Sequence, residues 1–355
     1  MGLTHIREEI LAISIVCAQL AACQKEGTDS LSASHSPLHH FAQSIVDLTV
    51  DARSGQVAVC TGSPEARPSY GDGVSNTLYL LIDGTVADSN PFMRFPGRRI
   101  TALSFISSAH GLICGVSDKT LHYWPYDKSA SGWSISETDA TSIVCSSESG
   151  TVFVGVQSEA RAKGEGGCVR AFAPSGEELY STEQFASTPI RLASSDKAGT
   201  LAIGFSSGEV VLRGLTANDE SAAVRQSGDA VVHLAFSDDG KLLAICDSNG
   251  FAIHNVSTKQ EVAMNVDRGR RCRLCSFLSN AEEHSGNANE DDVVTVCSLG
   301  DGTDGVLKLW RIANGEVSFK HAQRLVDRIG YVALDADRRM LFIGSGRDLV
   351  RVPVE

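Results

Sequence analysis

Residues 231–257 read VVHLAFSDDGKLLAICDSNGFAIHNVS, which is three short apolar runs separated by two turn signals. The runs are rich in Val, Leu, Ile and Phe, a composition typical of β-strands. The segments between them, SDDG and DSNG, carry the Asp, Asn, Ser and Gly residues that favour tight reversals of the chain. This stretch therefore predicts three short strands in succession.

The same order of strand, turn, strand, turn and strand recurs along the chain. The copies begin near residues 44, 99, 141, 190, 231, 273 and 330. Their starts are about 40 to 58 residues apart, which is the period of four-stranded propeller blades. Because each unit exposes an apolar sheet face that only a neighbour can cover, we expect the units to close into a ring. The predicted fold class is all-β, a seven-bladed β-propeller over residues 44–355.

The composition limits the class of partner and the cellular compartment that we expect for this protein. The chain has 355 residues and a formal net charge of −12, which argues against a nucleic-acid groove and favours a basic protein surface as partner. Several of its ten cysteines lie in apolar strand-like runs, where a free thiol packs as a small hydrophobe. This usage favours a reducing compartment, so the cytoplasm is the expected location.

Residues 1–43 are predicted to be an apolar N-terminal segment and a linker. The run ILAISIVCAQLAA, residues 10–22, is short for a membrane span but matches the core of an export signal in length. The preceding MGLTHIREE is acidic where an export signal is basic, so we favour an amphipathic or buried helix. The alternative is a bacterial lipoprotein in which Cys23 is acylated after cleavage. Any membrane association is expected to come from this segment or from a partner.

The repeat at 231–257 resembles the WD-repeat β-propeller family, turn for turn. The chain departs from that family's usual dipeptide, since Trp310 is followed by Arg311 and Trp124 by Pro125. The resemblance implies a WD-repeat propeller whose loops carry the function.

Three insertions interrupt the repeats, at residues 61–75, 158–167 and 279–292. The first ends in GVSN, residues 73–76, followed by the apolar strand LYLL. A second run, RGRRCRLCSFL at 268–278, lies in the sixth repeat. Both resemble motifs of the endoplasmic-reticulum exchange factors for Sar-type GTPases, the family of the prolactin regulatory element-binding protein. The glycine run of that family's loop is replaced here by SPEARPSY.

This second resemblance implies a guanine nucleotide exchange factor that acts on a small GTPase in vesicle export from the endoplasmic reticulum, without covalent chemistry. The implied GTPase-contacting loop is Gly71, Asp72, Gly73, Val74, Ser75 and Asn76. Asp72 and Asn76 would be the polar ligands of a potassium ion, a hard cation that prefers oxygen. The protein would then be a monomer at the cytosolic face of the endoplasmic reticulum. The alternative hypothesis is a non-catalytic WD-repeat scaffold for protein interaction.

Other motifs predict structural rather than chemical roles. Cys272 and Cys275 form a single CxxC, and in a regular strand this spacing places one thiol in the core and the other on the surface. His233 and His254 lie within predicted strands, where we expect structural histidines rather than catalytic bases.

Overall fold

The computed structural model describes residues 37–354 except 52, 63–75, 83–84, 87–90, 127–130, 159–165, 218–220, 227, 267–270, 279–293, 302–305, 314–315, 326–328 and 337. All described strands belong to one unit, residues 35–355. Most of the predicted GTPase-contacting loop, the N-terminal run with Cys23 and the insertion at 279–292 lie outside the described residues.

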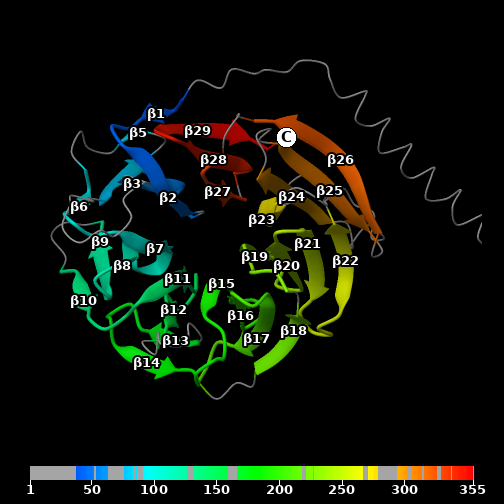
Figure 1. The fold of residues 1–355 in the computed structure, drawn as a ribbon, viewed down its shortest axis with the longest axis horizontal. Helices are drawn as coiled ribbons and strands as arrows, with labels where there is room; N and C mark the ends of the chain where they lie inside the picture. Colours follow the sequence, from blue (N-terminus) through cyan, green and yellow to red (C-terminus); the bar gives the residue numbers. More distant parts are fainter. Residues whose placement is uncertain are drawn as a thin grey trace, which may run out of the picture. The chain divides into compact units, whose positions relative to one another are not determined.

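The strands of this unit form seven antiparallel sheets arranged in a ring (Figure 1). Each sheet places one strand nearest the centre of the ring, and we name each sheet by this inner strand. In chain order the inner strands are β2, β7, β11, β15, β19, β23 and β27. The prediction of an all-β, propeller-like ring is confirmed.

The first three sheets follow one another in the chain. The β2 sheet contains β2 (Ser44–Asp51), β3 (Gln56–Gly62), β4 (Asn76–Ile82) and β5 (Thr85–Val86), and β6 (Met93–Phe95) also pairs with β4. The β7 sheet contains β7 (Ile100–Ile106), β8 (Gly111–Val116), β9 (Thr120–Pro125) and β10 (Trp133–Ile135). The β11 sheet contains β11 (Ala140–Cys145), β12 (Val152–Gln157), β13 (Gly167–Phe172) and β14 (Glu178–Ser181).

The remaining four sheets complete the ring. The β15 sheet contains β15 (Pro189–Ser195), β16 (Thr200–Phe205), β17 (Glu209–Gly214) and β18 (Ser221–Gln226). The β19 sheet contains β19 (His233–Phe236), β20 (Leu242–Asp247), β21 (Gly250–Asn255) and β22 (Glu261–Val266). The β23 sheet contains β23 (Arg271–Leu278), β24 (Val294–Asp301), β25 (Val306–Ala313) and β26 (Glu316–Arg324). The β27 sheet contains β27 (Tyr331–Asp335), β28 (Met340–Ser345), β29 (Asp348–Pro353) and β1 (His39–His40).

Apolar side chains fill the spaces between neighbouring sheets. Phe153 and Val169 of the β11 sheet pack with Leu201 of the β15 sheet in one buried cluster. Leu307 of the β23 sheet and Leu341 of the β27 sheet share another. Because each sheet uses its neighbour to remove its apolar face from water, the ring is stabilised as a whole.

Both ends of the described chain meet in the β27 sheet. Strand β1 pairs with β29, with His39 opposite Leu349. Phe41, which follows β1, is 2% exposed and packs with Leu349 and with residues of the β2 sheet. The ring therefore includes residues that precede position 44, where the sequence placed its start. His39–His40 has no strand pattern of its own, and its pairing partner lies at the other end of the chain.

The prediction of one surface thiol in the CxxC was wrong. Cys272 is 6% exposed and Cys275 is fully buried. The register of β23 against β24 shifts between Cys272 and Leu274, so Arg273 is an extra residue in the strand. A bulge changes the alternation of faces, and both thiols consequently lie in the core.

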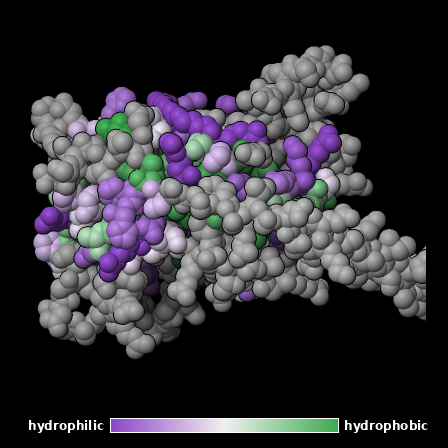
Figure 2. Space-filling model, turned by 90° about the horizontal axis from the view of Figure 1, so that it is seen from above, coloured by the Kyte–Doolittle hydropathy of each residue, from purple (hydrophilic) through white to green (hydrophobic). Residues whose placement is uncertain are grey.

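Within the described residues, helix is limited to one short 3₁₀ turn, Ser107–Ala109, and no helix there is long and apolar enough to span a membrane. On the face seen in Figure 2, hydrophobic residues occur in small groups among hydrophilic ones. The large hydrophobic side chains that are most exposed are Ile82, Leu179, Met264, Phe319 and Tyr331. Tyr331 is the member of this set that lies on an inner strand.

Candidate functional site

One position in each inner strand forms what we call the inner ring. Its members lie near the start of the inner strands, each directly before an apolar residue of the strand. They are Asp47, Ala102, Ser142, Arg191, His233, Arg273 and Tyr331. The register of five of the seven inner strands shifts at or next to this position. A bulge re-aims side chains near it, which is a common device at functional sites.

The polar residues of the inner ring lie on the strands nearest the middle of the ring. Asp47 lies on β2 and Arg191 on β15, two strands whose sheets are not neighbours, yet the charge of Arg191 lowers the pKa of Asp47 in opposition to the larger effect of burial. Asp47 and Arg191 therefore lie close enough across the ring for their charges to interact. Arg191 is exposed and Tyr331 is 41% exposed, so water reaches them there.

Side-chain hydrogen bonds hold consecutive members of the inner ring against the next sheet. The Ser142 hydroxyl accepts a bond from the Leu192 N–H at 3.2 Å. The Arg191 Nε donates to the Val232 carbonyl at 2.6 Å. These bonds fix the side chains in direction, because the acceptors and donors are backbone atoms of inner strands or lie next to them.

The same arrangement continues around the ring. His233 Nδ1 lies 3.1 Å from the Cys275 carbonyl oxygen, so it is the protonated nitrogen of the ring. The Arg273 Nη1 donates to the Gly330 carbonyl at 2.6 Å, next to Tyr331.

Burial changes the ionisation of two inner-ring members. It raises the pKa of Asp47 to about 6, while the Leu48 N–H and Arg191 act in the opposite sense. Burial also lowers the pKa of His233 to about 4, and the charge of Arg191 adds to this effect. At neutral pH the inner ring therefore holds two guanidinium groups, one carboxylate and a neutral imidazole.

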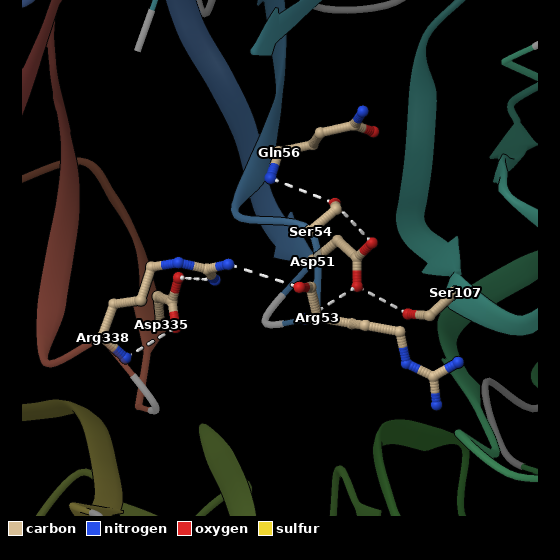
Figure 3. Close-up of polar contacts among 7 residues, drawn as sticks. All are labelled: Asp51, Arg53, Ser54, Gln56, Ser107, Asp335 and Arg338. Atoms are coloured by element: carbon tan, nitrogen blue, oxygen red, sulfur yellow. Dashed lines mark hydrogen bonds and ion pairs between the residues drawn. The ribbon is translucent and has the colours of Figure 1, made fainter. Parts of the chain in front are cut away.

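The opposite end of the inner strands is organised differently (Figure 3). Asp51, at the end of β2, is 5% exposed. Its carboxylate accepts bonds from the Ser54 hydroxyl and, from the next sheet, the Ser107 hydroxyl, both at 2.6 Å. These contacts occupy the Asp51 carboxylate within the fold.

Asp335 has the same position at the end of β27 and is 1% exposed. It accepts bonds from the Arg338 backbone N–H at 3.1 Å and from the Arg338 Nη1 at 2.8 Å. The Arg338 Nη2 then reaches the Arg53 carbonyl of the β2 sheet at 3.3 Å (Figure 3). This chain of contacts joins the two sheets at which the ring closes.

A pocket of about 360 Å³ lies between the β7 and β11 sheets. Its lining includes Arg170, whose Nε and Nη2 bind both carboxylate oxygens of Glu178 and whose Nη1 donates to Thr138. Acidic residues Glu137 and Asp139 also line it. Arg170 is therefore engaged by the fold, and the acidic residues add negative charge to the lining.

Asn76 is the one described member of the predicted GTPase-contacting loop. It is 3% exposed, its Nδ2 donates to the Thr61 carbonyl at 3.3 Å, and its Oδ1 accepts from the Ile100 N–H at 2.7 Å. A Cβ on Gly62 would collide with the Asn76 amide, so glycine makes room for it. The amide thus joins the β2 sheet to the β7 sheet. Its part in a potassium site stays a prediction, and Gly71–Ser75 lie outside the described residues.

Groups of three or more His, Cys, Asp or Glu side chains that could hold a metal ion do not occur in the described part of the chain.

Sequence reasoning missed the inner ring, although the repeats contain a signal for it. When the repeats are aligned on the apolar residue that follows the inner-ring position, the preceding residue is variable and mostly polar. The pairs are Asp47-Leu48, Ala102-Leu103, Ser142-Ile143, Arg191-Leu192, His233-Leu234, Arg273-Leu274 and Tyr331-Val332. A variable polar position inside an otherwise repeated apolar strand indicates a functional surface rather than packing in the core.

Comparisons with known proteins give the fold. No family model matches the chain, and no curated protein matches it in sequence. Among solved structures, U3-55K superposes with a TM-score of 0.65 at 12% identity, covering 90% of this chain and 99% of that one. The WD40 repeats of RRP9 give 0.65 at 11% identity, with 91% and 98% covered. A chain of the mitotic checkpoint complex gives 0.64 at 15% identity, with 92% and 97% covered. These likenesses show a β-propeller fold, and none of the three is described as a nucleotide exchange factor.

Proposed function

We propose that this protein is a non-catalytic WD-repeat scaffold that binds a protein partner at the inner ring. The observation that carries the proposal is the convergence of exposed and half-buried polar side chains from several sheets on one place, each fixed by bonds to the backbone. Pre-positioned side chains lose little freedom on binding and are suited to recognition. The exposed Tyr331 adds an aromatic group of the kind enriched in protein interfaces.

The test is a comparison of partners retained by the intact protein and by variants. The full chain would be tagged in its native cells and purified with its partners, alongside an Arg191→Ala, Tyr331→Ala double variant and an Arg347→Ala control at an exposed turn. We expect proteins that are retained by the wild type and the control and lost from the double variant. Equal retention by all three would show that the inner ring is not the binding surface.

The finer hypothesis of a Sar-type exchange factor has its own test. Wild-type protein would be mixed with Sar-type GTPase loaded with fluorescent GDP, with and without potassium. Faster GDP release that depends on potassium and is lost on Asp72→Ala would support that hypothesis and the potassium site. Unchanged release would leave the scaffold as the function. The scaffold is the better supported of the two, because the Asn76 amide already bonds to two strands of the fold.

A further inference from the structure

The basic members of the inner ring lie on three consecutive sheets. Arg191, His233 and Arg273 come from β15, β19 and β23. The chain as a whole carries a formal net charge of −12, so two guanidinium groups gathered at the centre oppose the charge of the molecule. A local field of this sign favours a ligand group of negative charge.

The Arg191 side chain is held in place by hydrogen bonds and is exposed to solvent. Its Nε donates to the Val232 carbonyl and its Nη1 to the Ile190 carbonyl, each at 2.6 Å. Its Nη2 donates to no residue that the structure describes, and the side chain is exposed. A guanidinium held by two backbone carbonyls presents its remaining N–H groups in one direction, which is the geometry that binds a carboxylate or phosphate.

Neighbouring groups add to this donor surface. The Arg273 Nη1 is anchored on the Gly330 carbonyl, which places that guanidinium beside Tyr331. Asp47 is the acidic member of the inner ring and interacts with Arg191 from across the centre. Because Asp47 places a negative charge near the same guanidinium, its removal would favour an anionic ligand there.

We infer that the inner ring binds an anionic side chain, a carboxylate or a phosphate, on an exposed segment of a partner protein, with Arg191 as its anchor. This inference rests on the proposed function, because it names the chemistry of the partner at that site. A nucleic-acid backbone fits less well, since two guanidinium groups at the centre of an acidic molecule cannot follow a run of phosphates.

The experiment uses a library of random peptides displayed on phage, selected on the full-length protein. Wild type is expected to enrich peptides that contain Asp or Glu, and Arg191→Glu is expected to lose them. One enriched peptide is then synthesised with a fluorescent label, and its Kd is measured for wild type, Arg191→Gln and the exposed control Arg347→Gln. We expect Arg191→Gln to weaken binding by about tenfold or more, and Arg347→Gln to leave it unchanged.

Two further arms define the chemistry. Replacing the acidic residue of the peptide by Gln is expected to abolish binding, and replacing it by phosphoserine is expected to retain it. The tighter of the carboxylate and phosphate peptides identifies the source of the anion. Asp47→Asn removes the nearby carboxylate and is expected to tighten binding by about threefold. This variant decides the matter if Arg191→Gln does not fold.

Enriched peptides without acidic residues, acidic peptides that bind Arg191→Gln as well as wild type, or no change on Asp47→Asn would overturn the inference. In the first two cases peptides still bind, so the proposed scaffold function stands. An absence of enriched peptides together with an absence of retained partners would overturn both.

Discussion

Asn76 shows how one buried amide joins two sheets. Its Oδ1 accepts a hydrogen bond from the Ile100 N–H of β7, and its Nδ2 donates one to the Thr61 carbonyl of β3. Without this side chain, one donor and one acceptor at a sheet boundary would lose their partners, and an unpaired buried polar group is costly. The residue that the sequence singled out for chemistry is therefore part of the framework.

We expect Asn76→Ala to lower the free energy of unfolding by about 2 kcal/mol, because two backbone groups lose their bonds. Urea denaturation followed by fluorescence measures the change. Gln43→Ala, which removes a similar amide from an exposed position, is the control and should change stability by less than about 0.5 kcal/mol. Equal effects of the two substitutions would contradict the role of Asn76.

The ionisation of Asp47 makes the stability of the protein depend on pH. Its pKa is raised to about 6 by burial, so the folded protein binds this proton more tightly than the unfolded chain does. The contribution of Asp47 to stability is thus present below about pH 4 and is lost as the pH rises through 6. Of the titratable groups near it, Arg191 keeps its charge, Tyr331 stays protonated, and His233 ionises only near pH 4.

We therefore expect Asp47→Asn to stabilise the protein at pH 7.5 by about 1 kcal/mol, a value reduced because the side chain is only half-buried. At pH 4 the gain should vanish. Paired urea titrations of wild type and variant at the two pH values measure it, with the exposed Glu148→Gln as control. A gain that is the same at both pH values would show that Asp47 does not titrate near 6.

At the scale of elements, the segment around β1 stabilises the closed ring through Phe41, the residue that follows the strand. Phe41 is 2% exposed and packs against Leu349 and Leu48, so it ties the end of the chain to the β2 sheet. We expect Phe41→Ala to cost about 3 kcal/mol, the usual effect of removing a buried aromatic ring. Ala42→Ser, at the exposed neighbouring position, is the control in the same denaturation experiment. A loss of less than about 1 kcal/mol would mean that β1 is not essential to closure.

The strands themselves could be predicted, because apolar runs and turn residues such as SDDG at 237–240 act locally. The bulge at Arg273 could not, since an extra residue in a strand leaves no mark in the apolar pattern until the partner strand is known. Strand β1 was missed for a related reason. His39 and His40 become a strand only through a partner at the other end of the chain.

The inner ring was not predicted from the sequence, and the predicted loop at residues 71–76 stays a prediction. A resemblance to one family directed attention to residues 71–76, whereas the inner ring depends on residues from all seven sheets meeting at one level. Asp47 and Arg191 are 144 residues apart in the chain, and nothing in either local sequence indicates that they face each other. Only alignment of the repeats with one another would have shown it.

At the scale of the whole molecule, the ring closes at one boundary through two separate devices. Phe41 packs at the boundary between the β27 and β2 sheets, and the Arg338 guanidinium crosses the same boundary to the Arg53 carbonyl. Distant substitutions normally add in their effect on stability. Here, a substitution that opens the boundary at either Phe41 or Arg338 also removes much of the stabilisation that the other residue contributes.

We therefore expect the double variant Phe41→Ala, Arg338→Ala to lose less stability than the sum of the two single losses, by at least about 0.5 kcal/mol. A double-mutant cycle in urea measures the difference. Pairing Phe41→Ala with Asn76→Ala, which acts at another boundary, supplies the additive reference. Strict additivity in both cycles would show that the two devices act independently.

Closure of the ring also sets an order of events during synthesis of the protein. His40 and its partner Asp348 are 308 residues apart, so the first strand emerges from the ribosome long before β29 exists. Until then β1 has no edge to pair with, and the nascent sheets present unpaired strands at both margins. We expect closure of the ring to wait until β29 has emerged, and folding helpers to act on the segment around β1 until then.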